Sequence, residues 1–166
     1  MRYKIVSGEL ELEPIKEKPD PLALKWDVRL TQFGVSYNRN DLDKPWLLAA
    51  WITIDGQIIT APEWAREYMN FAEAGADHHA LGKIIDTEGH TVRGLGLELS
   101  WKEGYVQPTM KASGWYNVPL YSSYDPSTGS GGYTWGPVGG QVLRNLGLPL
   151  KRHISTFGVW LEPRGA

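Results

Sequence analysis

Residues 78–101 read HHALGKIIDTEGHTVRGLGLELSW, and this stretch decides the fold class. In its second half apolar residues recur at every other position, at Leu95, Leu97, Leu99 and Trp101, with glycine or polar residues between them. Alternation of this kind is typical of a strand with one buried face. The four residues 86–89 (DTEG) separate the two halves and predict a turn. We therefore expect two strands around a turn, and a β-sandwich as the architecture.

Two more stretches carry strand signals. Residues 46–54 (WLLAAWITI) are apolar at both parities, which predicts a central strand covered on two sides, and Asp55-Gly56 after it predicts a hairpin turn. Residues 153–161 alternate and predict a closing strand. The apolar positions of the three best signals predict the core, which should be buried between two sheets and contain Trp51, Ile52, Leu97, Leu99, Phe157 and Val159.

The remaining segments of the body carry weaker signals. Residues 25–37 predict a strand with Trp26, Val28 and Leu30 pointing inward and a bulge near Thr31 or Gln32. Residues 105–115 contain Pro108, which predicts a strand at the edge of a sheet. Residues 139–149 predict a connection with apolar residues beneath it.

Residues 60–73 are the one helix candidate. Thr60 and Glu63 have the spacing of a capping box at the start of a helix. An irregular strand and loop is the alternative for this segment. At most one short helix is therefore expected.

At 166 residues the chain has the length of one domain, and neither a repeat nor a linker divides it. The beginning differs from the rest, because Pro14, Pro19 and Pro21 keep the backbone extended and out of helix. We expect an extended N-terminal arm over residues 1–25, which either lies along the domain's edge or reaches a neighbouring subunit. Residues 26–166 should form a single β-sandwich domain.

Charge and composition narrow the classes of partner. With 17 Lys and Arg against 19 Asp and Glu, the net charge is −2 and the pI near 6.1, which argues against nucleic acid or an anionic membrane surface as a partner. The chain has no cysteine, so it offers neither a disulfide nor a thiolate ligand. No apolar segment of signal-peptide type follows the first charged residues. We expect a protein made in the cytoplasm, without a cofactor.

The histidines are the first candidates for metal ligands, at His78, His79, His90 and His153. The adjacent pair would face opposite ways in a strand, and no HExxH or equivalent spacing is present. Asp and Glu fall in turns and on solvent faces rather than in pairs across a cleft. Ser155 and the other serines lack the G-x-S-x-G context of a nucleophile. We expect no metal site and no catalytic residue.

Aromatic residues offer a more promising site, since the chain has eight Trp and eight Tyr. Several of them gather with an asparagine around a Gly/Ser-rich loop, at Trp115, Tyr116, Asn117, Tyr121, Tyr124, Tyr133 and Trp135. Exposed rings give flat apolar faces for sugars, and a nearby amide can fix hydroxyl groups. Tyr and Trp are also enriched at subunit interfaces. We predict that this cluster binds either a sugar or another subunit.

The order of motifs resembles a known family. After a Trp-bearing strand come Asp77-His78-His79, the DTEG turn with a strand that ends in Trp101, N-x-P-L-Y at 117–121, L-G-L at 146–148 and R-H-x-S-x-F at 152–157. Over residues 45–161 the chain is similar to a bacterial and phage Ig-like accessory module found beside cell-wall-directed hydrolases and in surface or phage-derived proteins. The resemblance implies an Ig-like antiparallel β-sandwich with an attachment role, and it carries over no catalytic residue.

The leading hypothesis is a non-enzymatic structural or attachment protein of a multi-subunit assembly, such as a capsid decoration or tail-associated protein of a phage virion. Its partners would be copies of itself or other particle subunits, and its final location a virion or extracellular particle. The alternative is a carbohydrate-binding module that recognises polysaccharide or peptidoglycan through exposed aromatics. Neither hypothesis requires nucleic acid, a membrane or catalysis.

Overall fold

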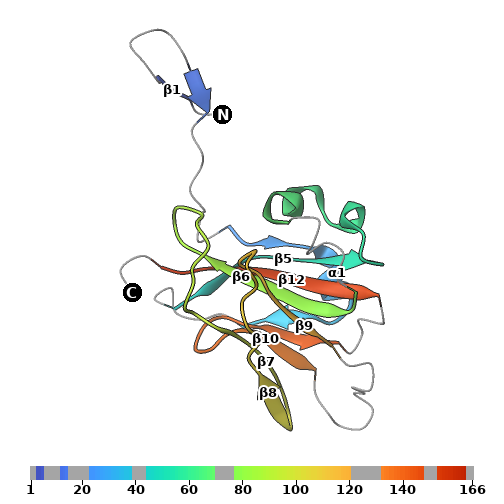
Figure 1. Cartoon of the computed structure of the whole chain (residues 1–166). Helices are drawn as coiled ribbons and strands as arrows, with labels where there is room; N and C mark the ends of the chain where they lie inside the picture. Colours follow the sequence, from blue (N-terminus) through green and yellow to red (C-terminus); the bar gives the residue numbers. More distant parts are fainter. Residues whose placement is uncertain are drawn as a thin grey trace.

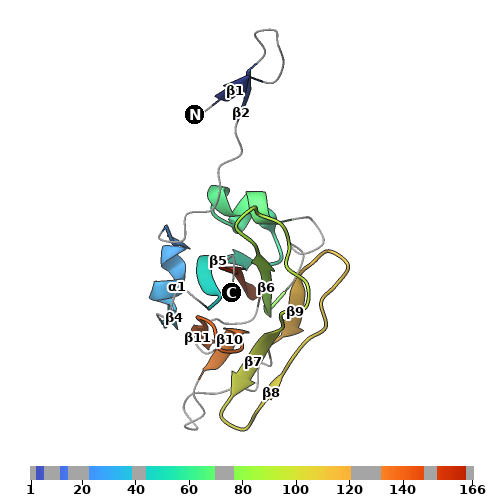
Figure 2. The same ribbon diagram turned by 90° about the vertical axis from the view of Figure 1, so that its left-hand side faces the viewer.

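A computed structural model describes residues 3–5, 12–14, 23–38, 44–69, 77–120, 132–147 and 153–163. Over these residues the protein is mainly β, with two five-stranded sheets that pack face to face (Figures 1 and 2). The first sheet has the order β3 (Lys25–Trp26), β5 (Trp46–Ile54), β12 (Ile154–Leu161), β6 (His79–Ile85) and β9 (Tyr116–Pro119). The second has the order β4 (Ser36–Tyr37), β11 (Leu143–Leu146), β10 (Tyr133–Pro137), β7 (Leu97–Trp101) and β8 (Gly104–Val106). The predicted β-sandwich is thus confirmed.

The sandwich was predicted to be antiparallel, but two of its strand pairs are parallel. In the first sheet β12 pairs with β6 in parallel, and β3 pairs with β5 in parallel. The predicted turn after β6 is present, since Asp86 Oδ1 accepts hydrogen bonds from the backbone N–H of Glu88 and His90 at 2.9 Å. Beyond this turn the chain crosses to β7 in the other sheet. β6 and β12 are therefore partners far apart in sequence, and no tight turn forces them to be antiparallel.

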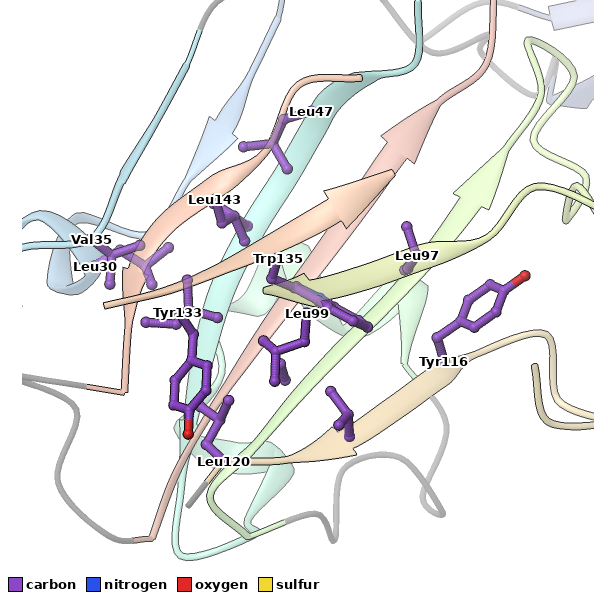
Figure 3. Packing of buried hydrophobic residues seen from close by; sticks show 14 of the residues in the cluster. Leu30, Val35, Leu47, Leu97, Leu99, Tyr116, Leu120, Tyr133, Trp135 and Leu143 are labelled. Carbon is purple, nitrogen blue, oxygen red and sulfur yellow. The ribbon is translucent and has the colours of Figure 1, made fainter. Parts of the chain in front are cut away.

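All six residues predicted for the core are buried, but only Ile52, Leu97 and Leu99 lie in the cluster between the sheets. The prediction of burial between the sheets is wrong for Trp51, Phe157 and Val159, which belong to a cluster on the other face of the first sheet. β12 lies between β5 and β6, and both of its faces are covered. Between the sheets packs an inner cluster that contains Trp135, Leu97 and Leu99 (Figure 3). The indole of Trp135 also donates a hydrogen bond to the carbonyl of Leu81 at 3.1 Å, which links the two sheets.

An outer cluster covers the other face of the first sheet. Its centre is Trp51, which stacks on Phe157 with ring centroids 5.3 Å apart and an interplanar angle of 6°. Two short 3₁₀ turns, η1 (Ile58–Thr60) and η2 (Glu63–Tyr68), follow the Asp55-Gly56 turn, and Trp64 and Tyr68 pack against Trp51. The helix predicted for residues 60–73 is therefore 3₁₀ over its described part. Thr60 is no cap there, because its Oγ1 accepts from the Ile54 N–H instead.

The strand predicted over residues 25–37 is wrong at its centre. A five-residue helix, α1 (Val28–Gln32), separates β3 from β4. Asp27 caps this helix by accepting a hydrogen bond from the Arg29 N–H, and the local cap outweighs the strand-like alternation of the sequence. Leu30 is buried, as predicted, whereas Val28 is 67% exposed.

Two smaller predictions have different outcomes. β8 lies at the edge of the second sheet, as the proline in residues 105–115 predicted. The segment 139–149 was predicted as a connection, but it contains β11, which pairs with both β10 and β4. Leu143 and Leu146 are buried beneath it as expected. The sequence does not reveal β11, because a strand of four residues is too short to show a clear alternation.

Before the sandwich, β1 (Tyr3–Ile5) and β2 (Leu12–Pro14) form a two-stranded antiparallel hairpin. These strands hydrogen-bond with each other and belong to neither five-stranded sheet. Both views show the hairpin outside the sandwich (Figures 1 and 2). The arm expected over residues 1–25 therefore has a paired element of its own.

Candidate functional site

Most of the predicted aromatic site is buried rather than exposed. Trp115, Tyr116, Tyr133 and Trp135 are exposed by 5% or less, and Figure 3 shows the last three among the packed core residues. Asn117 is half-buried, and Tyr121 and Tyr124 lie outside the described residues. The four buried rings cannot present a flat face to a sugar or a subunit. Tyr133 and Trp135 are buried because strand alternation places both side chains on the inner face of β10.

Three of the four histidines meet at one end of the first sheet. The parallel pairing of β6 and β12 brings their starting residues together, and His153 Nδ1 lies 2.9 Å from Asp77 Oδ2. The hydroxyl of Ser155 accepts a hydrogen bond from the His79 N–H at 3.0 Å. The Nδ1 atoms of His78 and His79 are buried and have no hydrogen-bond partner among the described residues. Within the described ranges, no group of three or more His, Cys, Asp or Glu could hold a metal ion.

His78, at the end of the first sheet where β6 and β12 begin, should make the stability of the protein depend on pH. Burial lowers the pKa of His78 from its ordinary 6.5. A hydrogen bond with the backbone of Ile154 and the charge of Asp77 oppose this effect, and His79 and His153 reinforce it. Because the pKa is lower in the folded chain than in the unfolded one, protonation favours unfolding. Stability should therefore fall as the pH drops from about 7 through 6.5 towards the folded-state pKa.

We expect His78→Asn to reduce this pH dependence. Asparagine tolerates the positive φ of 54° at this position, and it does not titrate. Melting temperatures of both proteins between pH 7.5 and pH 5 test this expectation. The wild type should lose more thermal stability than the variant over that interval, and parallel curves would show that His78 contributes nothing.

A cavity of about 400 Å³ lies at the opposite end of the sandwich, where β5 begins and β12 ends. Its apolar wall includes Leu95, Val138 and three prolines, and Lys44, Gln107 and Glu162 supply its polar groups. Neither Lys44 nor Glu162 forms an ion pair with another described residue. The Gln107 amide donates to Glu98 Oε2 at 3.0 Å. The cavity thus combines an apolar wall with two charged side chains, Lys44 and Glu162, that have no ion-pair partner among the described residues.

A second unusual feature is a half-buried lysine on β6. The Nζ of Lys83 lies 5.2 Å from the ring centroid of Trp115, a cation–π contact. Sequence reasoning missed Lys83 because a single lysine in an apolar strand usually belongs to a solvated face. Its apolar neighbours in HALGKII were the signal that could have identified it. Nothing in the sequence marks the cavity, because five separate segments line it.

Comparison with known proteins finds no matching family model, no matching curated protein and no matching solved structure. Of the helices that the structure describes, none is long and apolar enough to cross a membrane.

Proposed function

We propose that the protein is a non-enzymatic structural or attachment protein that assembles through its N-terminal arm, as a component of a phage virion or a similar particle. The β1–β2 hairpin carries this proposal. Among the described strands, β1 and β2 pair only with each other, and the hairpin lies outside the sandwich (Figures 1 and 2). An isolated two-stranded hairpin is at best marginally stable in water. A surface on a neighbouring subunit would supply the missing contacts.

The arrangement of polar groups supports a role other than catalysis. The Asp77–His153 pair is the best candidate for proton transfer, but it lies where β12 begins, whereas the cavity lies where β12 ends. At a rise of about 3.3 Å per residue, an eight-residue strand separates the two by roughly 26 Å. Proton transfer requires hydrogen-bond reach, so the pair cannot act on a ligand in the cavity.

Deletion of residues 1–24 tests the proposal. The truncated chain begins at β3 and keeps both five-stranded sheets, so we expect it to fold but to remain monomeric. Light scattering gives the molar mass, and thermal unfolding confirms that the sandwich is intact. Removal of residues 164–166 at the other terminus is the control. A truncated protein that assembles like the full chain would contradict a role for the arm.

The cavity favours carbohydrate binding as a second candidate function. Hydroxyl groups could bind Lys44, Gln107 and Glu162, while the apolar wall contacts a sugar ring. Gly96 provides the test, because a Cβ added there meets no atom within 4 Å and its φ is not positive. We expect Gly96→Phe to fill the cavity and to abolish binding on a glycan array or to peptidoglycan. Glu103→Phe, in the exposed turn before β8, is the control, and equal binding by both variants would exclude the cavity.

A further inference from the structure

Two opposite charges without partners lie at one end of the first sheet. The register of β5 and β12 pairs Trp46 with Leu161, so Lys44, shortly before β5, and Glu162, directly after β12, lie at the same end of adjacent strands. Both line the cavity described above. No ion pair joins them to each other or to another described residue. Their ammonium and carboxylate groups can therefore bind a ligand in the cavity.

Free backbone groups line the same cavity. Gly94, Leu95 and Gly96 precede β7 and belong to the cavity wall. Their N–H groups donate to no described residue, whereas the Leu95 carbonyl accepts from the Tyr116 hydroxyl at 2.6 Å. Both glycines are exposed, and a Cβ added at either meets no described atom within 4 Å. Glycine lets another backbone approach closely, so this stretch can hydrogen-bond with the main chain of a ligand.

We propose that the cavity binds a short peptide with free ends, whose ammonium group contacts Glu162 and whose carboxylate contacts Lys44. The N–H groups of residues 94–96 donate to carbonyl groups of the peptide, as they do when a strand is added to a sheet. The apolar wall, with Leu95, Val138 and three prolines, contacts the side chains of the peptide. The cavity volume of about 400 Å³ suits a small ligand, since such pockets measure roughly 300–1,000 Å³.

A zwitterionic peptide fits these groups better than a neutral sugar. Sugar hydroxyls would leave both charged side chains without a counter-ion, whereas a peptide with free ends supplies one for each. The inference goes beyond the proposed assembly, because it requires neither the arm nor a second copy of the chain. It also names a ligand that differs from the one of the second candidate function.

Calorimetry with trileucine and its capped forms tests the proposal in the full-length protein. We expect free trileucine to bind, and either N-acetylation or C-terminal amidation to raise its Kd about fivefold, because each removes one charge-assisted contact. Gly96→Phe, which fills the cavity, should abolish binding of trileucine.

Variants of the two charged residues assign the ends of the peptide. Glu162→Gln should raise the Kd of free trileucine about fivefold and remove its difference from the N-acetylated form. Lys44→Met should raise this Kd similarly and remove the difference from the amidated form. Lys102→Met and Glu103→Gln, in the exposed turn before β8, are the matched controls and should bind trileucine like the wild type.

The outcomes separate this inference from both candidate functions. Equal binding of free and capped trileucine, or no binding at millimolar concentration, would overturn the peptide ligand. Binding of a neutral oligosaccharide in place of trileucine would also overturn it and would support the second candidate function. Deletion of residues 1–24 should leave the Kd for trileucine unchanged. A monomeric full-length protein that binds trileucine would therefore contradict the role of the arm and support the peptide ligand.

Discussion

Phe157→Ala should lower the free energy of unfolding by about 3–5 kcal/mol, the range for emptying a buried ring site. The ring is fully buried, stacks on Trp51 and meets the edge of Trp115 at a centroid distance of 5.8 Å. Its removal leaves a cavity between three elements that cannot all move inward. Chemical denaturation measures the effect directly, and the melting temperature should fall by about 6–20 °C.

Tyr105→Ala is the matched control for this prediction. Tyr105 lies on the edge strand β8 and is 67% exposed, so its removal should change the free energy of unfolding by no more than about 0.5 kcal/mol. Equal stability of Phe157→Ala and the wild type would mean that β12 has a different phase from the one described.

Asp27→Ala should be the second most destabilising change, at about 2–4 kcal/mol. The carboxylate is buried and performs three tasks at once. It caps α1 at the Arg29 N–H, pairs with the Arg29 guanidinium at 2.7 Å, and accepts from the Ile52 N–H at 3.2 Å. Truncation leaves a buried N–H without a partner and a guanidinium without its counter-ion.

Denaturation of Asp27→Ala beside Glu103→Ala measures this effect. Glu103 is exposed in the turn before β8, so its truncation should be nearly neutral. A double-mutant cycle with Arg29→Ala separates the ion pair from the cap, because the single variants share the pair's contribution. If Asp27→Ala and Glu103→Ala melt alike, the carboxylate does not hold α1 against β5.

The sandwich could be predicted because its strongest signals are local. In β5 apolar residues occupy both faces, and in β7 they alternate, so the burial of these strands follows from their own sequences. β12 was predicted as an alternating strand, but both of its faces are buried. The pairing of β6 with β12 could not be predicted in this way. It joins segments more than 70 residues apart, and its direction depends on where the chain crosses between sheets.

The candidate site was harder to predict, because the role of each residue depends on its neighbours in the folded protein. The alternation of Tyr133 and Trp135 shows that both share a face, but only the position of the first sheet shows that this face is inner. Asp27 resembles an ordinary polar residue in a strand until its bonds to Arg29 and Ile52 are known. Lys83 was visible in the sequence, whereas its contact with the ring of Trp115 depends on the folded structure.

The molar mass of the full-length protein in solution tests the central claim most directly. Multi-angle light scattering over a range of concentrations should give a multiple of the 18.6 kDa chain mass, corresponding to a trimer or a larger assembly. Deletion of residues 1–24 should reduce the molar mass to that of a single truncated chain. A full-length protein that remains at 18.6 kDa up to high concentration would contradict assembly through the arm.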